Sequence, residues 1–426
     1  MKTIQPTNAM ILREDTRFEP GTYVVPEGIT IAADGITVDG NGARLIGNGA
    51  GGTAIRLEGV SQVTLKNFQI SGFSRGIAAV DGQGLTIKNC RIRDGALNPN
   101  ALPPAFPWQI AEAFPDAIFL AGVTDSQIIN NDLQFQANGF AAYSCQRLEV
   151  RGNTASHQPG FGFLLNDTSQ STFRENTADH CGADGLSPHA QTPEGHLAAG
   201  FLLVNGAEHN VFQSNTARAC STGFKLMGLT PQNQAAPCSQ NRFEDNDASH
   251  CIYDGFADHH NQENHYLQNQ VHNANIGFTL DHVSGARLEN NSLFGNHRAG
   301  VAAVNSVHCD LIHNTLQDNR FGVLLWSRPD PQAQSTLPEN DTSKFWEIRN
   351  NTFLRNHTGI RIAADQVAGL TALGPDQAGK LPKPHDHEIL QNVFSDNRIG
   401  IQTQSVERTV IKDNQFELNL LGDIKS

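Results

Sequence analysis

Residues 255–259 read Gly-Phe-Ala-Asp-His, residues 277–281 read Gly-Phe-Thr-Leu-Asp, and residues 300–304 read Gly-Val-Ala-Ala-Val. Each segment begins with a glycine followed by an apolar residue, and successive glycines are 22 and 23 residues apart. The same pair recurs at Gly76, Gly139, Gly162, Gly200, Gly223, Gly322, Gly359 and Gly400. A repeat of this length indicates a solenoid in which one short unit stacks on the next.

The side chains within each repeat alternate with a period of two, which is typical of β-strands. The first and third residues after the glycine are apolar and are expected to point inward, so the second and fourth point outward. Three short strands in about 22 residues cannot bury a hydrophobic face alone. We therefore expect each strand to pair with its equivalent in the next coil, about 4.8 Å away.

A second pattern consists of an asparagine followed by a small or β-branched residue and then an apolar one. An asparagine at a fixed turn position can bond to the backbone and side chain of the next coil, and so form a ladder. We expect this ladder role for most of these asparagines. The pattern begins at Asn153, Asn176, Asn215, Asn291, Asn314 and Asn351.

These repeats resemble the right-handed parallel β-helix of the carbohydrate-binding and sugar-hydrolase superfamily, and they are similar to the repeats of its NosD-like group. The resemblance covers residues 28–421 and implies an all-β solenoid of about thirteen coils. Residues 1–27 are expected to form an N-terminal cap, and residues 28–426 a single β-helix domain. Five repeats are longer than the others, which predicts loop insertions near residues 95–115, 184–198, 228–240, 327–345 and 363–386.

Composition excludes several classes of function. The formal net charge is −13, with 30 Lys and Arg against 43 Asp and Glu, and no basic run stands out, so we expect no nucleic-acid partner. No stretch approaches about 20 apolar residues, so we expect no membrane span. The seven cysteines include no Cys-x-x-Cys pair, and the N-terminal residues lack an apolar leader. We therefore expect a cytoplasmic protein without disulfides. The sequence does not indicate an oligomeric state.

Ionisable residues concentrate on the outward positions of the middle coils. His259 and Asp281 occupy the same position in adjacent coils, and a carboxylate beside an imidazole suits acid–base catalysis. Asp258 takes an inward position where other repeats carry leucine, so its carboxyl group must be paired or have a raised pKa. The predicted catalytic residues are Lys225, Tyr253, Asp254, Asp258, His259 and Asp281.

A substrate cleft is expected over the glycine-led strands, between the loop insertions. Aromatic rings stack on sugar faces, and amides and imidazoles bond to hydroxyl groups. The predicted substrate-binding residues are Trp108, Tyr143, Asn166, His260, His282, Trp326 and Arg361.

The favoured function is hydrolysis of a glycosidic bond in an oligosaccharide or glycoside, with Asp254, Asp281 and Asp258 as the candidate carboxyl groups. The alternative chemistry is elimination or C5 epimerisation of a uronate, with Lys225 as neutraliser, His259 as base and Tyr253 as acid. A further alternative is a non-catalytic solenoid that binds a glycan or a partner. We expect no cofactor, and a divalent metal at His259, His260 and His282 is the alternative to that expectation.

Overall fold

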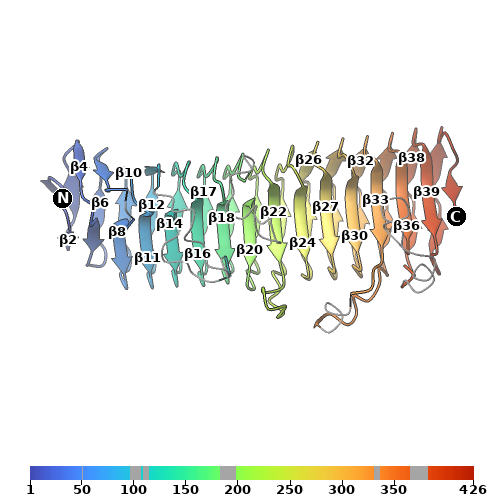
Figure 1. Ribbon diagram of the computed structural model, residues 1–426, viewed down its shortest axis with the longest axis horizontal. Coiled ribbons are helices and arrows are strands. Elements are labelled where there is room, and N and C mark those ends of the chain that lie inside the picture. Colours follow the sequence, from blue (N-terminus) through green and yellow to red (C-terminus); the bar gives the residue numbers. More distant parts are fainter. Residues whose placement is uncertain (50, 96–106, 109–114, 183–197, 331–335, 365–381) are drawn as a thin grey trace. The chain divides into compact units, whose positions relative to one another are not determined.

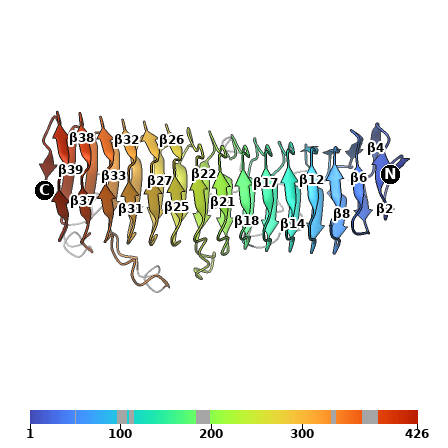
Figure 2. The same cartoon turned by 180° about the vertical axis from the view of Figure 1, so that it is seen from behind.

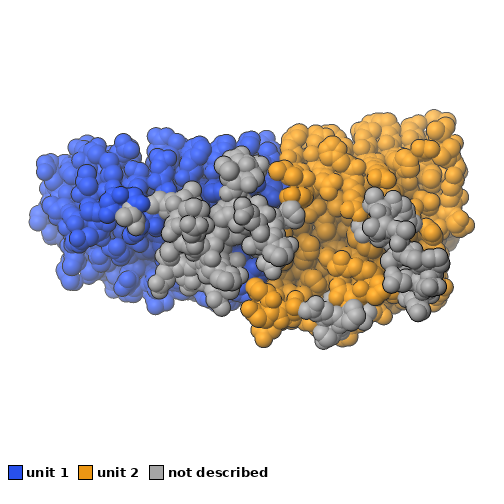
Figure 3. Space-filling view, viewed as in Figure 1, with its two compact units in different colours: residues 1–222 blue, residues 223–426 orange. Residues whose placement is uncertain are grey.

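The computed structural model describes residues 1–49, 51–95, 107–108, 115–182, 198–330, 336–364 and 382–426. The chain forms two compact units, residues 1–222 and residues 223–426 (Figure 3). In each unit, three parallel sheets run along a stack of coils, and consecutive strands of the chain belong to different sheets (Figure 1). The predicted right-handed parallel β-helix is confirmed.

The described residues of unit 1 contain nine strands of sheet 1, eight strands of sheet 2 and four strands of sheet 3. Sheet 1 contains, in spatial order, β1 (Lys2–Ile4), β3 (Thr16–Phe18), β6 (Thr37–Asp39), β9 (Thr64–Lys66), β12 (Thr86–Lys88), β15 (Gln127–Ile129), β17 (Glu149–Arg151), β19 (Thr172–Arg174) and β21 (Val211–Gln213). Sheet 2 contains β2 (Met10–Leu12), β5 (Ile29–Ile31), β8 (Thr53–Glu58), β11 (Arg75–Val80), β14 (Asp116–Ala121), β16 (Asn138–Tyr143), β18 (Phe161–Asn166) and β20 (Ala199–Val204). Sheet 3 contains β4 (Thr22–Val24), β7 (Arg44–Ile46), β10 (Gln69–Ser71) and β13 (Arg91–Arg93).

Unit 2 repeats this plan, which Figure 2 shows from behind. Sheet 1 contains β23 (Arg242–Glu244), β25 (His265–Leu267), β28 (Arg287–Glu289), β31 (Asp310–Ile312), β34 (Glu347–Arg349), β37 (Glu388–Leu390) and β40 (Val410–Lys412). Sheet 2 contains β22 (Thr222–Met227), which begins one residue before the unit, β24 (Asp254–His259), β27 (Ile276–Asp281), β30 (Ala299–Val304), β33 (Phe321–Trp326), β36 (Thr358–Ala363), β39 (Ile399–Gln404) and β42 (Ile424–Lys425). Sheet 3 contains β26 (Gln270–His272), β29 (Ser292–Phe294), β32 (Thr315–Gln317), β35 (Thr352–Leu354), β38 (Val393–Ser395) and β41 (Gln415–Glu417).

The glycine-led segments are the six-residue strands of sheet 2, and they pair in the register that the repeat predicts. Phe256 pairs with Phe278, and Phe278 pairs with Val301. Glycine is needed because adjacent coils approach closely here. A Cβ atom on Gly277 would lie 2.4 Å from the carbonyl oxygen of Gly300, which is too close for any other residue.

Stacked aromatic rings fill the interior of both units. In unit 2, the ring centroid of Phe256 lies 4.7 Å from that of Phe224 and 4.6 Å from that of Phe278. Phe163 and Phe201 stack in the same way in unit 1, at 4.7 Å. Each ring is the first inward residue after a glycine, so the coil spacing sets the stacking distance.

The asparagine ladder is confirmed. The backbone N–H of Asn153 donates to Oδ1 of Asn176, and the N–H of Asn176 donates to Oδ1 of Asn215, both at 3.0 Å. In unit 2, the N–H of Asn291 donates to Oδ1 of Asn314, and the N–H of Asn314 donates to Oδ1 of Asn351, both at 2.8 Å. These side chains are buried, so the ladder satisfies polar groups that water does not reach.

Residues 1–27 are the segment that the sequence predicted to form an N-terminal cap. They contain β1 to β4, and these strands pair in parallel with later coils, as β2 does with β5 and β4 with β7. They are therefore coils of the stack. Of the expected insertions, residues 228–240 include a short antiparallel bridge between Leu229 and Ala235. Most of residues 95–115, 184–198 and 363–386 lie outside the described residues.

Within the described part of the chain, no helix has the length and hydropathy that crossing a membrane requires.

Replacement of Asn314 by alanine should lower the free energy of unfolding by about 2–3 kcal/mol, because it leaves the N–H of Asn291 buried without an acceptor. The measurement is chemical denaturation of the full chain. Thr315→Ala is the matched control, since Thr315 is exposed on the adjacent strand, and it should change stability by less than about 0.5 kcal/mol. Equal effects of the two substitutions would contradict the ladder's role.

Candidate functional site

A cluster of ionisable side chains lies on the outer face of sheet 2 in unit 2, over β22, β24 and β27. It includes four of the residues predicted to be catalytic, Lys225, Asp254, His259 and Asp281. The charges of Lys225 and His259 both act on the carboxyl group of Asp254, and His259 faces Asp281 in the next coil. The structure therefore brings these four residues together.

The pairing of His259 with Asp281 follows from the strand register, which places the two residues opposite each other. Nδ1 of His259 lies 3.8 Å from Oδ2 of Asp281. Nδ1 of His282 lies 2.5 Å from Oδ1 of Asp281, and the guanidinium of Arg328 lies 3.2 Å from Oδ2. Burial alone would raise the pKa of Asp281, but the bonds from His259 and His282 and the charge of Arg328 hold it well below its usual value.

Asp254 has the opposite electrostatic environment. Burial raises the pKa of its carboxyl group, although a hydrogen bond from the Thr279 hydroxyl at 2.9 Å and the charges of His259 and Lys225 oppose that effect. Thr279 and Asp281 are two residues apart on β27, which corresponds to about 7 Å along a strand. Asp254 is therefore linked through Thr279 to the strand that carries Asp281.

Lys225 is one coil away from Asp254, and its strand pairs with β24 so that Lys225 faces Ala257. Burial lowers the pKa of the Lys225 ammonium group to about 8, and the charge of Asp254 limits the decrease. Tyr253 immediately precedes β24 and is half-buried, and its carbonyl oxygen accepts a hydrogen bond from the N–H of Ile276.

Asp258 lies apart from this cluster, because its side chain points into the core. It is fully buried, and its carboxylate accepts hydrogen bonds from Tyr266 at 2.7 Å, from Asn261 at 2.7 Å and from Asn264 at 3.1 Å. Three donors satisfy most of its acceptor positions, as expected for a buried structural carboxylate, and its catalytic role stays a prediction.

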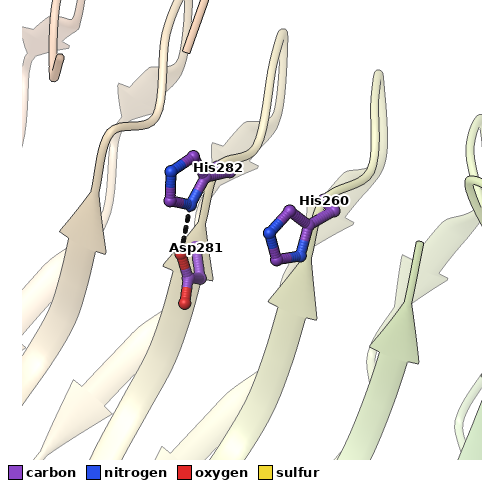
Figure 4. Close-up of side chains that lie close together, drawn as sticks. All are labelled: His260, Asp281 and His282. Atoms are coloured by element: carbon purple, nitrogen blue, oxygen red, sulfur yellow. Dashed lines mark hydrogen bonds and ion pairs between the residues drawn. The ribbon is translucent and has the colours of Figure 1, made fainter. Parts of the chain in front are cut away.

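His260, Asp281 and His282 form a second group beside the first (Figure 4). Their potential ligand atoms lie within 4.8 Å of one another. The rings of His260 and His282 stack with centroids 5.1 Å apart. Burial lowers the pKa of His260 to about 4, although the charge of Asp281 opposes that effect, so the ring is neutral at pH 7.

His282 uses both ring nitrogens in hydrogen bonds. Oδ1 of Asn305 accepts a bond from the N–H of Arg328, and this fixes the amide so that Nδ2 of Asn305 donates to Nε2 of His282 at 3.0 Å. Nδ1 of His282 then carries the proton that bonds to Asp281. A metal ligand needs a free lone pair, so His282 does not fit a metal site as it is placed here.

Arg328 and Asp330 belong to the site although sequence reasoning did not select them. They lie in the insertion near 327–345, and Asp330 lies 3.5 Å from Arg328 and 3.9 Å from Nε2 of His282. A loop residue has no place in the coil register, so the repeat pattern contains no signal for this contact. Thr279 and Asn305 do follow the register, at outward and turn positions.

The predicted substrate-binding residues of unit 2 are dispersed. Trp326 is only 7% exposed and packs against Val304 and Leu324 on the outer face of sheet 2. Arg361 lies four strands beyond β24 in the sheet order and donates hydrogen bonds to Gln402 and Gln404. The structure therefore places only His260 and His282 of this set at the cluster.

The predicted substrate-binding residues of unit 1 are engaged within the protein. Tyr143 is 4% exposed, and burial together with the charge of Asp116 raises the pKa of its hydroxyl group. Nδ2 of Asn166 donates to the carbonyl oxygen of Pro107 at 2.8 Å, and the carbonyl oxygen of Trp108 accepts a bond from Asn205. Residues 107–108 therefore lie against the outer face of these coils.

Several solved structures are similar to this chain over most of its length. The periplasmic alginate epimerase AlgG is 11% identical, with 95% of this chain and 78% of that chain covered, at a TM-score of 0.46. The A-module of the mannuronan C-5 epimerase AlgE4 from Azotobacter vinelandii is 14% identical, with coverage of 97% and 88% and a TM-score of 0.39. An alginate lyase from Paenibacillus sp. str. FPU-7 is 13% identical, with coverage of 66% and 89% and a TM-score of 0.42. Such distant similarity carries no argument about activity. The comparison with curated proteins found no match.

One protein-family model matches the chain, and its description is periplasmic copper-binding protein (NosD). This description contradicts the expected cytoplasmic location and points to the periplasm. The seven unpaired cysteines were one basis of that expectation, and they do not exclude the periplasm. All of them are buried, and burial raises the pKa of Cys90 and Cys145 to about 12, so free thiols are compatible with an oxidising compartment.

The family matches cover residues 27–234, 189–368 and 296–424 and so include nearly the whole chain. They agree with the coil repeat and with the parallel sheets of both units. The chain belongs to the NosD family.

Proposed function

We propose that this chain is a carbohydrate-active enzyme that hydrolyses a glycosidic bond on the outer face of sheet 2 in unit 2. The observation that supports this most is the opposite displacement of two neighbouring carboxyl pKa values, raised at Asp254 and lowered at Asp281. Glycoside hydrolysis requires one carboxylic acid that retains its proton and a second group that remains a base.

In this mechanism Asp254 is the general acid. It transfers its proton to the glycosidic oxygen as the bond between that oxygen and the anomeric carbon breaks. His259, held by Asp281, accepts a proton from a water molecule whose oxygen bonds to the anomeric carbon. Because the water attacks the anomeric carbon directly, without a covalent intermediate, inversion at that carbon is expected.

The surrounding contacts would keep the base in place. Asp281 is fixed by His282 and by Arg328, and His282 is fixed in turn by Asn305. A carboxylate held in this way orients an imidazole and stabilises it when it becomes protonated. Little reorganisation is then needed during the reaction.

The second candidate is elimination or C5 epimerisation of a uronate, and Lys225 favours it. An ammonium group with a pKa of about 8 is charged at neutral pH and lies beside the proposed acid. It can neutralise the carboxylate of a uronate while His259 removes the C5 proton. Tyr253 would then return a proton.

A non-catalytic glycan-binding surface has less support at this site. That hypothesis relied on Trp326 and Tyr143 as aromatic platforms, and both side chains are buried. Buried rings offer no face to a sugar in this arrangement.

Asp254→Asn, His259→Ala and Asp281→Asn should each lower turnover by about 100-fold or more, because each removes a proton donor, a proton acceptor or the group that orients it. Activity is measured in a screen of oligosaccharides that follows new reducing ends and the absorbance of an unsaturated uronate. Hydrolysis gives the first signal alone, and elimination gives both.

His265→Ala is the matched control, since His265 is a half-buried histidine on sheet 1 in the strand after β24. It should leave turnover within about twofold of the unmodified chain. Full activity of the His259→Ala or Asp281→Asn chain would exclude this site.

The Lys225 amine should titrate near pH 8. Its rate of acylation, measured by mass spectrometry across a pH series, should be half-maximal near that pH. Asp254→Asn should move the midpoint lower, because the carboxylate charge now opposes the effect of burial. Asp310→Asn, which removes a carboxylate from sheet 1, should leave it unchanged. A midpoint near 10.5, the usual value for lysine, would contradict the burial of this amine.

Copper is the metal that the family description implies, and imidazole is a suitable ligand for it. Because His282 has no free nitrogen, we expect no copper site at His260, Asp281 and His282. Equilibrium dialysis with Cu²⁺ should give the same stoichiometry for the unmodified chain and for His260→Ala. Loss of one equivalent of copper from the His260→Ala and Asp281→Asn chains would show that the cluster rearranges around the ion.

A further inference from the structure

Sheet 3 of unit 1 carries a polar concavity that is separate from the cluster described above. Its volume is about 260 Å³. It lies over β7, β10 and β13, and β10 is labelled in the blue part of Figure 1. The lining residues are Arg44, Gln69, Ile70, Ser71, Arg91, Arg93 and Asp94.

The strand register arranges these side chains in two rows. Gln69 pairs with Arg44 on one side and with Arg91 on the other, so the two arginines lie two coils apart, or about 10 Å. In the second row, Ser71 pairs with Arg93. Neutral donors and acceptors therefore alternate with guanidinium groups across the floor.

Two of the arginines are held in place by neighbours. Oδ2 of Asp132 lies 3.4 Å from Nε of Arg91 and also pairs with Arg93. The guanidinium of Arg93 lies over the ring of Phe135, 5.8 Å from its centroid. Arg44 is exposed and has no ion-pair partner among the described residues. Held guanidinium groups are preorganised for a ligand, since little side-chain entropy remains to be lost.

The local charge is unusual for this chain. Three arginines and two carboxylates, those of Asp94 and Asp132, lie in or beside the concavity, so its local charge is positive. The whole chain, in contrast, has a formal net charge of −13. A positive excess on an acidic protein attracts a small anion to this place. The row continues past Arg91 through Asp132 to Thr154 and Thr177, whose hydroxyl groups extend the polar surface along the coils.

We propose that this concavity binds an acidic oligosaccharide through the carboxylates of its sugar residues. A guanidinium binds a carboxylate through two parallel hydrogen bonds, and Gln69 and Ser71 offer partners for sugar hydroxyl groups. A coil spacing of about 4.8 Å is similar to the length of one pyranose residue, so successive sugars would meet successive coils. The proposal concerns unit 1 alone and does not depend on the reaction proposed for unit 2.

The polar floor distinguishes a sugar acid from a simple anion. Inorganic phosphate would bind to the arginine guanidinium groups, and Gln69 and Ser71 would remain hydrogen-bonded to water. A uronate residue carries one acid group and several hydroxyl groups, so it uses both kinds of side chain.

The test is isothermal titration calorimetry of the full chain with tetragalacturonate, with neutral maltotetraose and with inorganic phosphate. The tetrauronate should bind, with an affinity that falls as NaCl rises, and the other two should bind at least about tenfold more weakly. Arg44→Gln combined with Arg91→Gln should weaken tetrauronate binding by about tenfold or more.

Arg17→Gln is the matched control, because Arg17 is an exposed arginine on sheet 1 of the same unit, and it should leave binding unchanged. Equal binding of the neutral tetrasaccharide or of phosphate, or unchanged binding by the double variant, would overturn the proposal.

Discussion

Pairing between equivalent strands of successive coils is the constraint on which the rest of each unit depends. A coil of three short strands has no core of its own, and it gains one only when its neighbours cover both open edges. The register then aligns equivalent side chains of successive coils, one above the next. Thus Phe256 stacks on Phe278, and Asn291 bonds to Asn314, because the backbone has already aligned them. The ladders contribute stability, but the register decides which residues can form them.

The same constraint explains how much the sequence could predict. The glycine spacing predicts the strand pairing of sheet 2, and that pairing places His259 opposite Asp281. Alternation also predicted that Asp258 points inward. It could not reveal that Tyr266, Asn261 and Asn264 satisfy this carboxylate, because those donors come from a turn and from another sheet.

The repeat pattern cannot predict the contacts of residues that lie in the insertions, and the reason is physical. Arg328 reaches Asp281 from an insertion, and a loop follows no register. Outward aromatic residues are difficult to predict for a related reason, because an outward position on a strand is not always an exposed one. Trp326 and Tyr143 are outward on their strands and yet buried. Alternation predicts the face of a sheet but not what covers that face.

The pKa of Asp281 depends on its neighbours as well as on its position in the strand register. Any carboxylate at this position would face His259, but burial would then raise its pKa and weaken it as a partner. Its neighbours reverse that outcome: His259 itself, His282 at the next turn position and the charge of Arg328 from the insertion all lower the pKa of Asp281. Asp254 lacks such a set of donors, and its pKa stays raised. The contrast between two carboxyl groups on neighbouring strands therefore arises from the donors around Asp281, which come from the adjacent strand, a coil turn and the insertion.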